Sequence, residues 1–344
     1  MNKLTKVGCS ALCGSLAAIS AANAGELTIT GGVDMSWVSK DGNDSTTGNP
    51  IGMGSNLTFK GSGELDNGWT FGLTVAHLNK AQYSSAAVNI DMLGLGKLNF
   101  NQGDSGNGID AYDDKMPTAW EEPWGAGLGT GVQLVSGIGP NMNIQYTTPK
   151  ILGFTIATAV AHQMGASDTN DKGSSGVNTT NKGKGYDMTI NLNPSFGTEA
   201  LSGLNLFVGG HYTDVYKPAD LNDVYEGVAG FTLDLGPVSV GAQSTVESTG
   251  KRGSTDIDFY KNAMYGVAFN VNDDLSISYS THKSYQTNVS GDASQVLEME
   301  SYQAAYSMGG ASIRFADVSV ENASYQTQAQ YDKDAKILSV SLAF

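Results

Sequence analysis

The sequence predicts an all-β fold, a sixteen-stranded antiparallel transmembrane β-barrel, from three observations. Apolar and polar residues alternate over most of the chain with the period of two that is typical of strands. The connections between the alternating segments are short and long in turn, so short turns gather at one end of the sheet and long loops at the other. An export signal is present, but no apolar run is long enough for a membrane helix, so a membrane role must use strands.

Residues 1–24 have the features of a cleaved secretory signal: two lysines precede an apolar run at positions 7–19, and the segment ends on Ala-Asn-Ala. Residues 25–344 are then expected to form a single barrel domain. Cys9 and Cys13 both lie in the signal, so no disulfide is expected. Without the signal, 17 basic residues face 34 acidic ones, and nucleic acid is a poor partner for such a surface.

The first mature segment, "ELTITGGVDMSWV", shows the alternation clearly. Leu27, Ile29 and Met35 lie on one face, and Thr28 and Asp34 lie on the other. Sixteen segments of this kind are predicted, near 26–38, 53–65, 69–75, 86–92, 97–102, 141–147, 153–162, 186–193, 204–212, 224–235, 238–247, 263–271, 275–282, 296–308, 311–316 and 335–344.

The connections alternate in length along the chain. Short connections are expected at 66–68 ("DNG"), 93–96, 149–152, 236–237, 272–274 and 309–310, and 193–203 on the same side is longer than the others. Long connections are expected near 39–52, 79–85, 103–140, 163–185, 213–223, 248–262, 283–295 and 317–334. An even number of strands returns both chain ends to the end of the sheet that has the short connections, so the two chain ends are expected to lie together.

The last nine residues, "KILSVSLAF", keep the alternation to the final atom. An unpaired sheet edge has no hydrogen-bond partners in hydrocarbon, so the last strand is predicted to pair with the first and close the barrel. The residues expected to face lipid at this seam are Leu338, Val340, Leu342 and Phe344.

Three stretches carry a resemblance to a known family: "GLGKLNFNQGD", "NMNIQYTTPKILGFTIA" and the C-terminal strand ending in Phe344. The chain resembles the general diffusion porins of Gram-negative bacteria, most closely the sixteen-stranded, trimeric kind, over the entire mature chain. The resemblance implies an outer-membrane channel for passive diffusion of ions and small hydrophilic solutes. It also implies periplasmic short turns, a homotrimer surrounded by outer-membrane lipid, and a terminal strand that the barrel-assembly machinery recognises.

The third long connection, about 103–140, is acidic. A structureless loop of this length is usually functional or disordered. In porins the equivalent loop folds into the lumen and narrows it, so the resemblance nominates these charged residues as the pore constriction: Asp104, Asp110, Asp113, Asp114, Lys115, Glu121 and Glu122. A surface excursion whose acids are simply solvated stays open as an alternative.

Few basic residues have lumen-facing parity. The expected pore wall carries Lys60, Lys97 and Arg314, together with the acids Asp34, Glu64 and Asp91. Further acids share this parity, namely Asp187, Glu226, Asp234 and Glu247. Carboxylates around a water-filled pore favour cations, although salt screening limits the effect, so a modest cation preference is predicted.

Other residues of the chain are compatible with different kinds of site. Asp113 and Asp114 beside Lys115 resemble part of a calcium site, but the spacing matches no calcium loop, so we expect no metal or cofactor beyond weakly bound calcium at the acidic loops. The four histidines, His77, His162, His211 and His282, are expected at the rim without a shared site. No hydrolase or nucleotide-binding motif is present and no catalytic residue is predicted. A solute-specific channel and an outer-membrane barrel hydrolase remain as alternatives.

Overall fold

The structure is a computed structural model that describes residues 25–42, 49–79, 84–104, 106–125, 127–139, 141–165, 182–194, 202–216, 221–291 and 295–344. The predicted signal at 1–24 lies outside these residues. Among them, no helix is both long and apolar enough to span a membrane.

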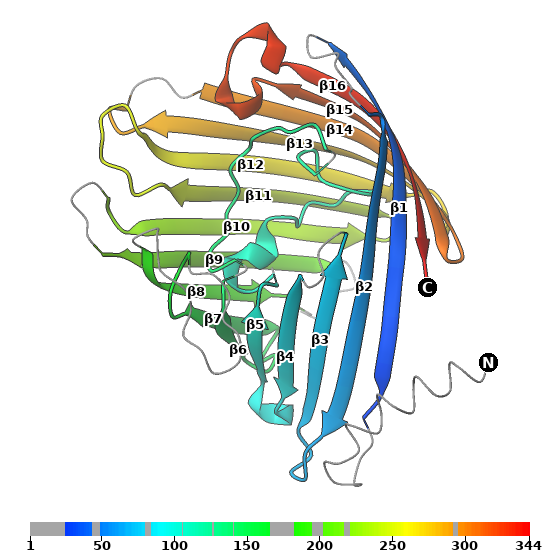
Figure 1. The fold of residues 1–344 in the computed structure, drawn as a ribbon, viewed down its shortest axis with the longest axis vertical. Coiled ribbons are helices and arrows are strands. Elements are labelled where there is room, and N and C mark those ends of the chain that lie inside the picture. The colour runs from blue at the N-terminus through cyan, green and yellow to red at the C-terminus, as the bar shows by residue number, and fades with distance from the viewer. Residues whose placement is uncertain are drawn as a thin grey trace.

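Sixteen strands of the described residues form one closed antiparallel barrel in which each strand pairs with its neighbours in the sequence (Figure 1). The strands are β1 Leu27–Gly42, β2 Ile51–Glu64, β3 Thr70–Leu78, β4 Ser85–Asp91, β5 Lys97–Gln102, β6 Asn143–Thr147, β7 Phe154–Ala161, β8 Lys182–Leu192, β9 Leu204–Val215, β10 Val224–Leu235, β11 Val238–Ser248, β12 Ile257–Asn270, β13 Leu275–Asn288, β14 Gln295–Met308, β15 Ala311–Glu321 and β16 Lys333–Ala343. Each predicted segment overlaps one of them, so the predicted fold class is confirmed.

Short 3-10 helices interrupt the connections. One, η1 Leu93–Leu95, lies in the short turn between β4 and β5, and another, η2 Gly108–Tyr112, lies in the long connection between β5 and β6. Two more, η4 Ala323–Tyr325 and η5 Ala329–Tyr331, lie between β15 and β16. Only two residues separate β10 from β11 and β14 from β15, whereas forty separate β5 from β6, so the expected contrast between the two ends of the sheet is present.

The two faces of the barrel differ as the alternation predicts. In β8, Tyr186 and Met188 are exposed on the outer face, whereas Asp187 and Thr189 between them are buried on the inner face. The exposed large hydrophobic side chains of the other strands share this outward parity, for example Met35 in β1, except Leu78 at the end of β3, which lies opposite the inward-facing Asn56. The outer face is therefore apolar and the inner face largely polar, which suits a barrel bathed in lipid around an aqueous lumen.

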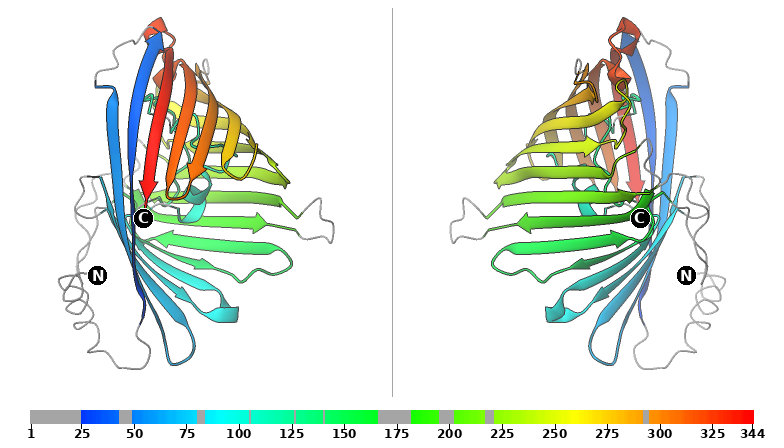
Figure 2. Two further views of the ribbon diagram at one scale, coloured as in Figure 1. Left: turned by 90° about the vertical axis from the view of Figure 1, so that its right-hand side faces the viewer. Right: turned by 90° about the vertical axis from the view of Figure 1, so that its left-hand side faces the viewer.

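The first and last strands close the barrel (Figure 2). β1 and β16 pair from Gly32 opposite Ala343 to Gly42 opposite Lys333. Beyond the last pair, the backbone N–H of Phe344 donates to the Gly31 carbonyl at 3.0 Å and the N–H of Gly31 donates back at 3.1 Å. The predicted seam is confirmed, and the chain end is ordered because both of its backbone groups are paired.

Candidate functional site

The connection between β5 and β6, residues 103–142 and here called loop 3, runs through the barrel interior instead of projecting away from the rim (Figure 1). Its backbone is hydrogen-bonded to lumen-facing side chains of β6, β8, β10, β11, β12, β13, β14 and β16. Loop 3 therefore lies against one wall of the lumen over most of its length.

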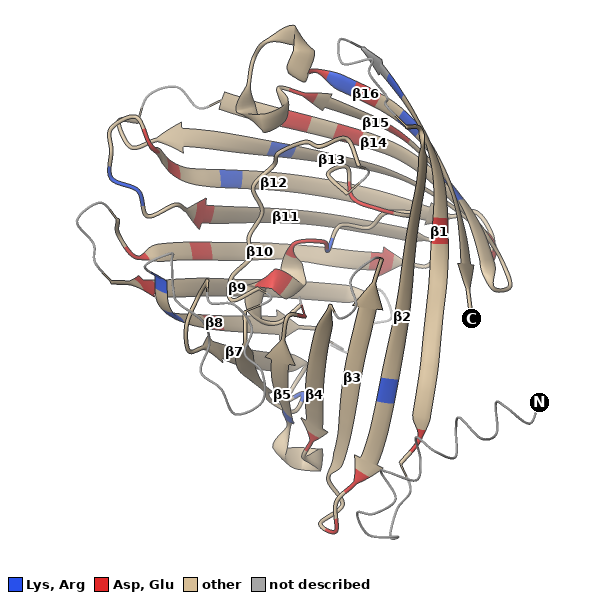
Figure 3. Cartoon of the chain, viewed as in Figure 1, with Lys and Arg blue, Asp and Glu red and all other residues tan. Residues whose placement is uncertain are grey.

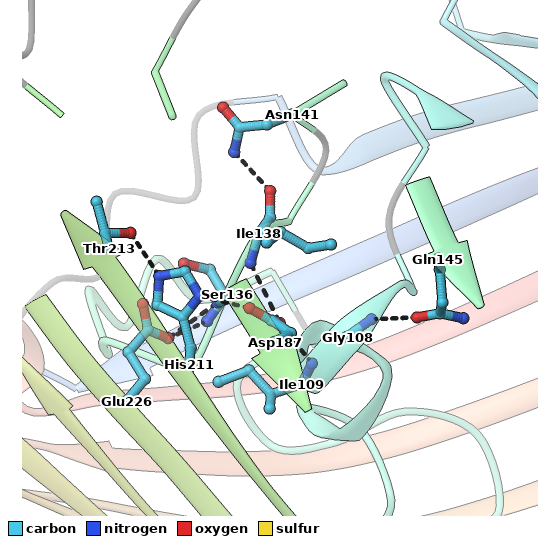
Figure 4. A network of polar contacts seen from close by, with 11 residues as sticks. Gly108, Ile109, Ser136, Ile138, Asn141, Gln145, Asp187, His211, Thr213 and Glu226 are labelled. Carbon is cyan, nitrogen blue, oxygen red and sulfur yellow. Dashed lines mark hydrogen bonds and ion pairs between the residues drawn. The ribbon is translucent and has the colours of Figure 1, made fainter. Parts of the chain in front are cut away.

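Two carboxylates of the wall hold both ends of the loop (Figure 4). Asp187 Oδ2 accepts hydrogen bonds from the backbone N–H of Ile109 at 2.8 Å and of Ile138 at 3.3 Å. Glu226 Oε2 accepts from the N–H of Ser136 at 2.8 Å and of Gly137 at 2.9 Å. Hydrogen bonds to a charged acceptor are about twice as strong as neutral ones. These carboxylates therefore fix the two ends of loop 3 against the wall.

A histidine and a threonine extend the Asp187 network. His211 Nδ1 lies 2.5 Å from Asp187 Oδ1, and His211 Nε2 lies 2.6 Å from Thr213 Oγ1. The order of acid, imidazole and hydroxyl is that of a hydrolase triad. All three side chains are buried, and Thr213 has no exposed surface, so the hydroxyl meets no solute while loop 3 is in place. The network therefore positions the loop in this conformation.

The start of the loop is also held by carboxamides. Asn107 Nδ2 donates to Asn99 Oδ1 in β5 and to Asn143 Oδ1 in β6, at 2.7 Å each. The N–H of Gly108 donates to Gln145 Oε1 at 2.7 Å. Gly108 has a positive φ of 63°, and a Cβ there would overlap the carboxylate of Asp187. Glycine is required at this point because the backbone approaches the wall so closely.

The middle of loop 3 rests on a flat part of the wall. Gly241 in β11 and Gly266 in β12 are opposite each other in register, and a Cβ on either would lie 2.7 Å from an atom of Pro117. Farther along, the N–H of Ala119 donates to Ser278 Oγ at 2.8 Å. Gln303 in β14 then accepts from the N–H of Trp120 at 3.0 Å.

The returning half of the loop packs against apolar side chains inside the barrel. Leu128 is buried with Leu297 and Met299 of β14 and with Val318 of β15. The connection between β15 and β16 adds polar contacts, because the Tyr325 hydroxyl accepts from the N–H of Gln133 at 3.1 Å. The sequence predicts a polar lumen face, but this half of the wall is more apolar. Loop 3 covers these side chains, so they are not in contact with the water of the lumen.

The nominated acids lie along this loop (Figure 3). Asp104 and Asp114 are exposed, and Lys115 Nζ pairs with Asp114 Oδ1 at 3.1 Å. Asp110 Oδ2 accepts from the N–H of Gly106 at 2.6 Å, and burial raises its pKa above the ordinary value. Their role at a constriction stays a prediction.

Three acids in this stretch are less open to water. Burial, followed by the charges of Asp114 and Asp110, raises the pKa of Asp113 to about 7. Glu122 is buried, and burial together with the neighbouring charge of Glu121 raises its pKa to about 8. Glu121 is half-buried. At neutral pH the loop therefore carries less negative charge than its composition indicates.

Most of the predicted wall residues are found in ion pairs. Arg314 Nη1 lies 3.2 Å from Asp34 Oδ1, and Lys97 Nζ lies 3.5 Å from Asp91 Oδ2. These residues have the lumen-facing parity that the sequence predicts. Lys60 in β2 and Glu64, the last residue of the same strand, are exposed with the same parity.

Among the described residues, no group of three or more His, Cys, Asp or Glu side chains is arranged to hold a metal ion. Asp113 and Asp114, which resemble part of a calcium site in the sequence, lie beside the Lys115 ammonium that pairs with Asp114.

The residues that fix the loop are the ones that sequence reasoning missed. The sequence predicts Asp187 and Glu226 as charged residues of the pore wall and His211 and His282 as rim residues. The structure corrects the histidine prediction, because His211 and His282 are 5% and 1% exposed and lie beneath loop 3. The sequence shows that these four residues are polar and lie within strands, but no pattern in the sequence indicates that loop 3 covers them.

An apolar outer face, a polar inner face and a long loop folded into the interior define a membrane β-barrel channel. A family model described as "Gram-negative porin" matches residues 8–306. The chain belongs to this family and is an outer-membrane porin. No curated protein sequence gives a significant match to it.

Solved structures share the fold. OmpF of Salmonella typhi, solved with daunomycin, is 14% identical with a TM-score of 0.67, over 93% of this chain and 98% of that one. OmpT of Vibrio cholerae is 10% identical with a TM-score of 0.65, over 95% and 100%. An anion-selective porin from Comamonas acidovorans is 14% identical with a TM-score of 0.59, over 93% and 100%.

Proposed function

We propose that this porin passes ions and small hydrophilic solutes passively, with a modest preference for cations. The observation that carries the proposal is the charge of loop 3, which has six acidic side chains and, within the loop, only Lys115 to oppose them. Burial raises the pKa of Asp113 to about 7 and that of Glu122 to about 8, so these two carry only part of their negative charge at neutral pH, but the other four acids still outnumber the lysine. The described ion pairs of the wall, Asp34 with Arg314 and Asp91 with Lys97, largely cancel there. The net charge along the passage is therefore negative, which favours cations.

A reversal potential tests the preference. With a KCl gradient across a planar bilayer, we expect the potential to have the sign of a membrane more permeable to potassium than to chloride. The preference is modest because charges are screened over about 8 to 10 Å at physiological salt. An anion-selective reversal potential, the property named for the Comamonas acidovorans porin, would overturn the proposal.

We infer that the channel is a homotrimer in outer-membrane lipid. Short strands support this inference: β4, β5 and β6 have seven, six and five residues, whereas a membrane-spanning strand needs about 9 to 11. If lipid alone surrounded this wall, the backbone groups next to the short strands would have no hydrogen-bond partners in the hydrocarbon. Neighbouring copies of the chain can cover these groups. On a gel, the unboiled protein is expected to run as a trimer that converts to monomer on boiling. A monomer in mild detergent at all concentrations would contradict the inference.

The C-terminal strand is proposed as the segment that the barrel-assembly machinery recognises. Phe344 is 79% exposed on the outer face, yet its backbone is the last pair of the seam. Deleting Phe344 is expected to lower the amount of assembled protein in the outer membrane more than the conductance of each assembled pore. Equal assembly of the deleted and intact chains would argue against this role.

We also propose that the chain has no catalytic activity. Among the described residues, the side chains that most resemble a hydrolase site are Asp187, His211 and Thr213, hydrogen-bonded in that order, and they are buried beneath loop 3. Ester and peptide hydrolysis by folded and heat-denatured protein would be compared. Activity that requires the folded protein and disappears in Thr213→Val would overturn the proposal and restore the hydrolase alternative.

A further inference from the structure

A hollow lies in the lumen wall at the barrel seam, where β1 and β2 meet β15 and β16. Its volume is about 590 Å³. Part of its lining consists of residues with little or no side chain, namely Gly32, Gly54 and Ser341. In register, Gly32 lies opposite Asn56, and Asp34 lies opposite Gly54, so each glycine leaves room beside a polar side chain.

An ion pair lines this hollow. Arg314 and Asp34 are 3.2 Å apart, and their side chains are 25% and 55% exposed. Arg314 Nε donates to Ser312 Oγ at 2.9 Å, and its guanidinium carbon lies 5.9 Å from the centre of the Trp120 ring of loop 3. The guanidinium is thus held in one place by β1, β15 and loop 3, while the carboxylate beside it remains half open to the lumen.

Neutral hydrogen-bonding groups line the hollow as well. They are the carboxamide of Asn56 and the hydroxyls of Thr30 and Thr58, all with lumen-facing parity. The hollow therefore offers one cationic group, one anionic group and several neutral polar groups within a small volume. A small number of polar groups that point into one hollow is typical of sites that bind small molecules.

We propose that this hollow is a weak binding site for small zwitterions, molecules such as α-amino acids that carry an ammonium and a carboxylate close together. The ammonium would lie on Asp34 and the carboxylate on Arg314, whose planar fork matches a carboxylate. A simple ion gains little here, because an ion that pairs with Asp34 or with Arg314 leaves the other side chain of the ion pair without a partner. A zwitterion replaces both partners, so the pair itself selects for two opposite charges on one molecule.

The inference rests on the proposed passive exchange of small hydrophilic solutes and names one class of them. Binding in a channel has to be weak enough for release, and a partly exposed ion pair in water provides weak binding. The Asp91 and Lys97 pair is the natural comparison, because it is also lumen-facing but its side chains are 41% and 70% exposed.

Reconstituted porin in a planar bilayer at about 0.1 M KCl, where screening is limited, tests the proposal with L-serine as the probe. L-Serine is expected to lower the open-channel current in a saturable way. Ethanolamine lacks the carboxylate, 3-hydroxypropionate lacks the ammonium, and glycerol lacks both. Each one-charge analogue is expected to need about fivefold more solute for half of the effect, since an exposed charge contact contributes about that factor. Glycerol is expected to show no saturation.

Variants of the pair separate this site from the rest of the lumen. Asp34→Asn and Arg314→Gln are each expected to raise the half-effect concentration of L-serine about fivefold. Asp91→Asn is the matched control and is expected to leave it within about twofold. Arg314→Lys keeps the charge and is a second variant if Arg314→Gln fails to assemble, with an intermediate value expected.

The outcomes distinguish this proposal from the broader one. Equal effects of L-serine and glycerol on conducting pores, or no change in Asp34→Asn and Arg314→Lys, would overturn the zwitterion site and leave the channel function standing. Bilayers that stay silent with trimeric, well-folded protein would instead overturn the proposed passive exchange itself.

Discussion

The two walls of the lumen are built in different ways. The wall of β8 to β14 is covered by loop 3, and its inward side chains, such as Thr245 and Asn262, are 2% and 0% exposed. The wall of β1 to β5 carries inward side chains such as Asn56 and Lys60 that remain exposed. The same alternation of residues thus produces a packed interior on one side and a solvated surface on the other.

The contrast shows that parity places a side chain inside the barrel but does not place it in the pore. Inward carboxylates on the covered wall, Asp187 and Glu226, hold the loop backbone, whereas inward charges on the open wall meet water or one another. Solutes are then expected to pass between loop 3 and the open wall, with the acids of the loop on one side.

Releasing the loop should have the largest effect. Asp187→Ala leaves His211 and the backbone N–H groups of Ile109 and Ile138 without their partner, and breaking a buried pair in this way costs about 3 to 5 kcal/mol. Unfolding in denaturant should show this decrease in the free energy of unfolding. Single-channel records should show larger fluctuations of the current, because the ends of loop 3 that Asp187 holds can then move. Asp187→Asn is the control, because its carboxamide can still accept from the loop and donate to His211. A quiet, unchanged current in Asp187→Ala would show that this carboxylate does not hold the loop.

A smaller effect is expected from crowding the place where the loop rests. Gly266→Ala puts a methyl group 2.7 Å from the carbonyl oxygen of Pro117, and overpacking of this kind costs about 1 to 3 kcal/mol. The displaced loop should narrow the passage and lower the conductance. Gly72→Ala on the open wall is the control, since the nearest atom lies 3.8 Å from the added Cβ. Equal conductance of the two variants would argue that loop 3 does not rest on Gly266.

Charge on the covered side should depend on pH. The raised pKa values of Asp113, about 7, and Glu122, about 8, mean that both carboxyl groups lose protons as the pH rises from 6 to 9. Negative charge is gained in that window, so the preference for potassium over chloride should increase. The double variant Asp113→Asn, Glu122→Gln should lose most of this increase. A preference that falls with rising pH would contradict the assignment.

The smallest effect is expected from an ion pair of the open wall. Asp91→Asn removes the partner of Lys97 where both side chains are well exposed, and such pairs contribute about 0 to 1 kcal/mol. Unfolding and conductance should stay close to those of the unchanged protein. A loss comparable to that of Asp187→Ala would erase the distinction between the two walls.

The fold could be predicted from the sequence because the alternation of residues such as Leu338, Ser339 and Val340 sets both the strand and its faces. The seam followed from the rule that a bilayer tolerates no open edge, and Phe344 confirms it. The anchoring of loop 3 could not be predicted, because Asp187 contacts Ile109 and Ile138, which lie 78 and 49 positions earlier in the chain. Alternation gives such a side chain a direction but no partner.

The reactivity of single introduced cysteines measures most directly which wall is open to solutes, because residues 25–344 contain no cysteine. Thr58→Cys lies on the open wall and Thr245→Cys on the covered wall, and both side chains point inward. A charged, thiol-specific methanethiosulfonate reagent added to conducting channels should change the current through Thr58→Cys within seconds and leave Thr245→Cys unchanged. Rapid modification of Thr245→Cys, or none of Thr58→Cys, would contradict a passage that runs between loop 3 and the wall of β1 to β5.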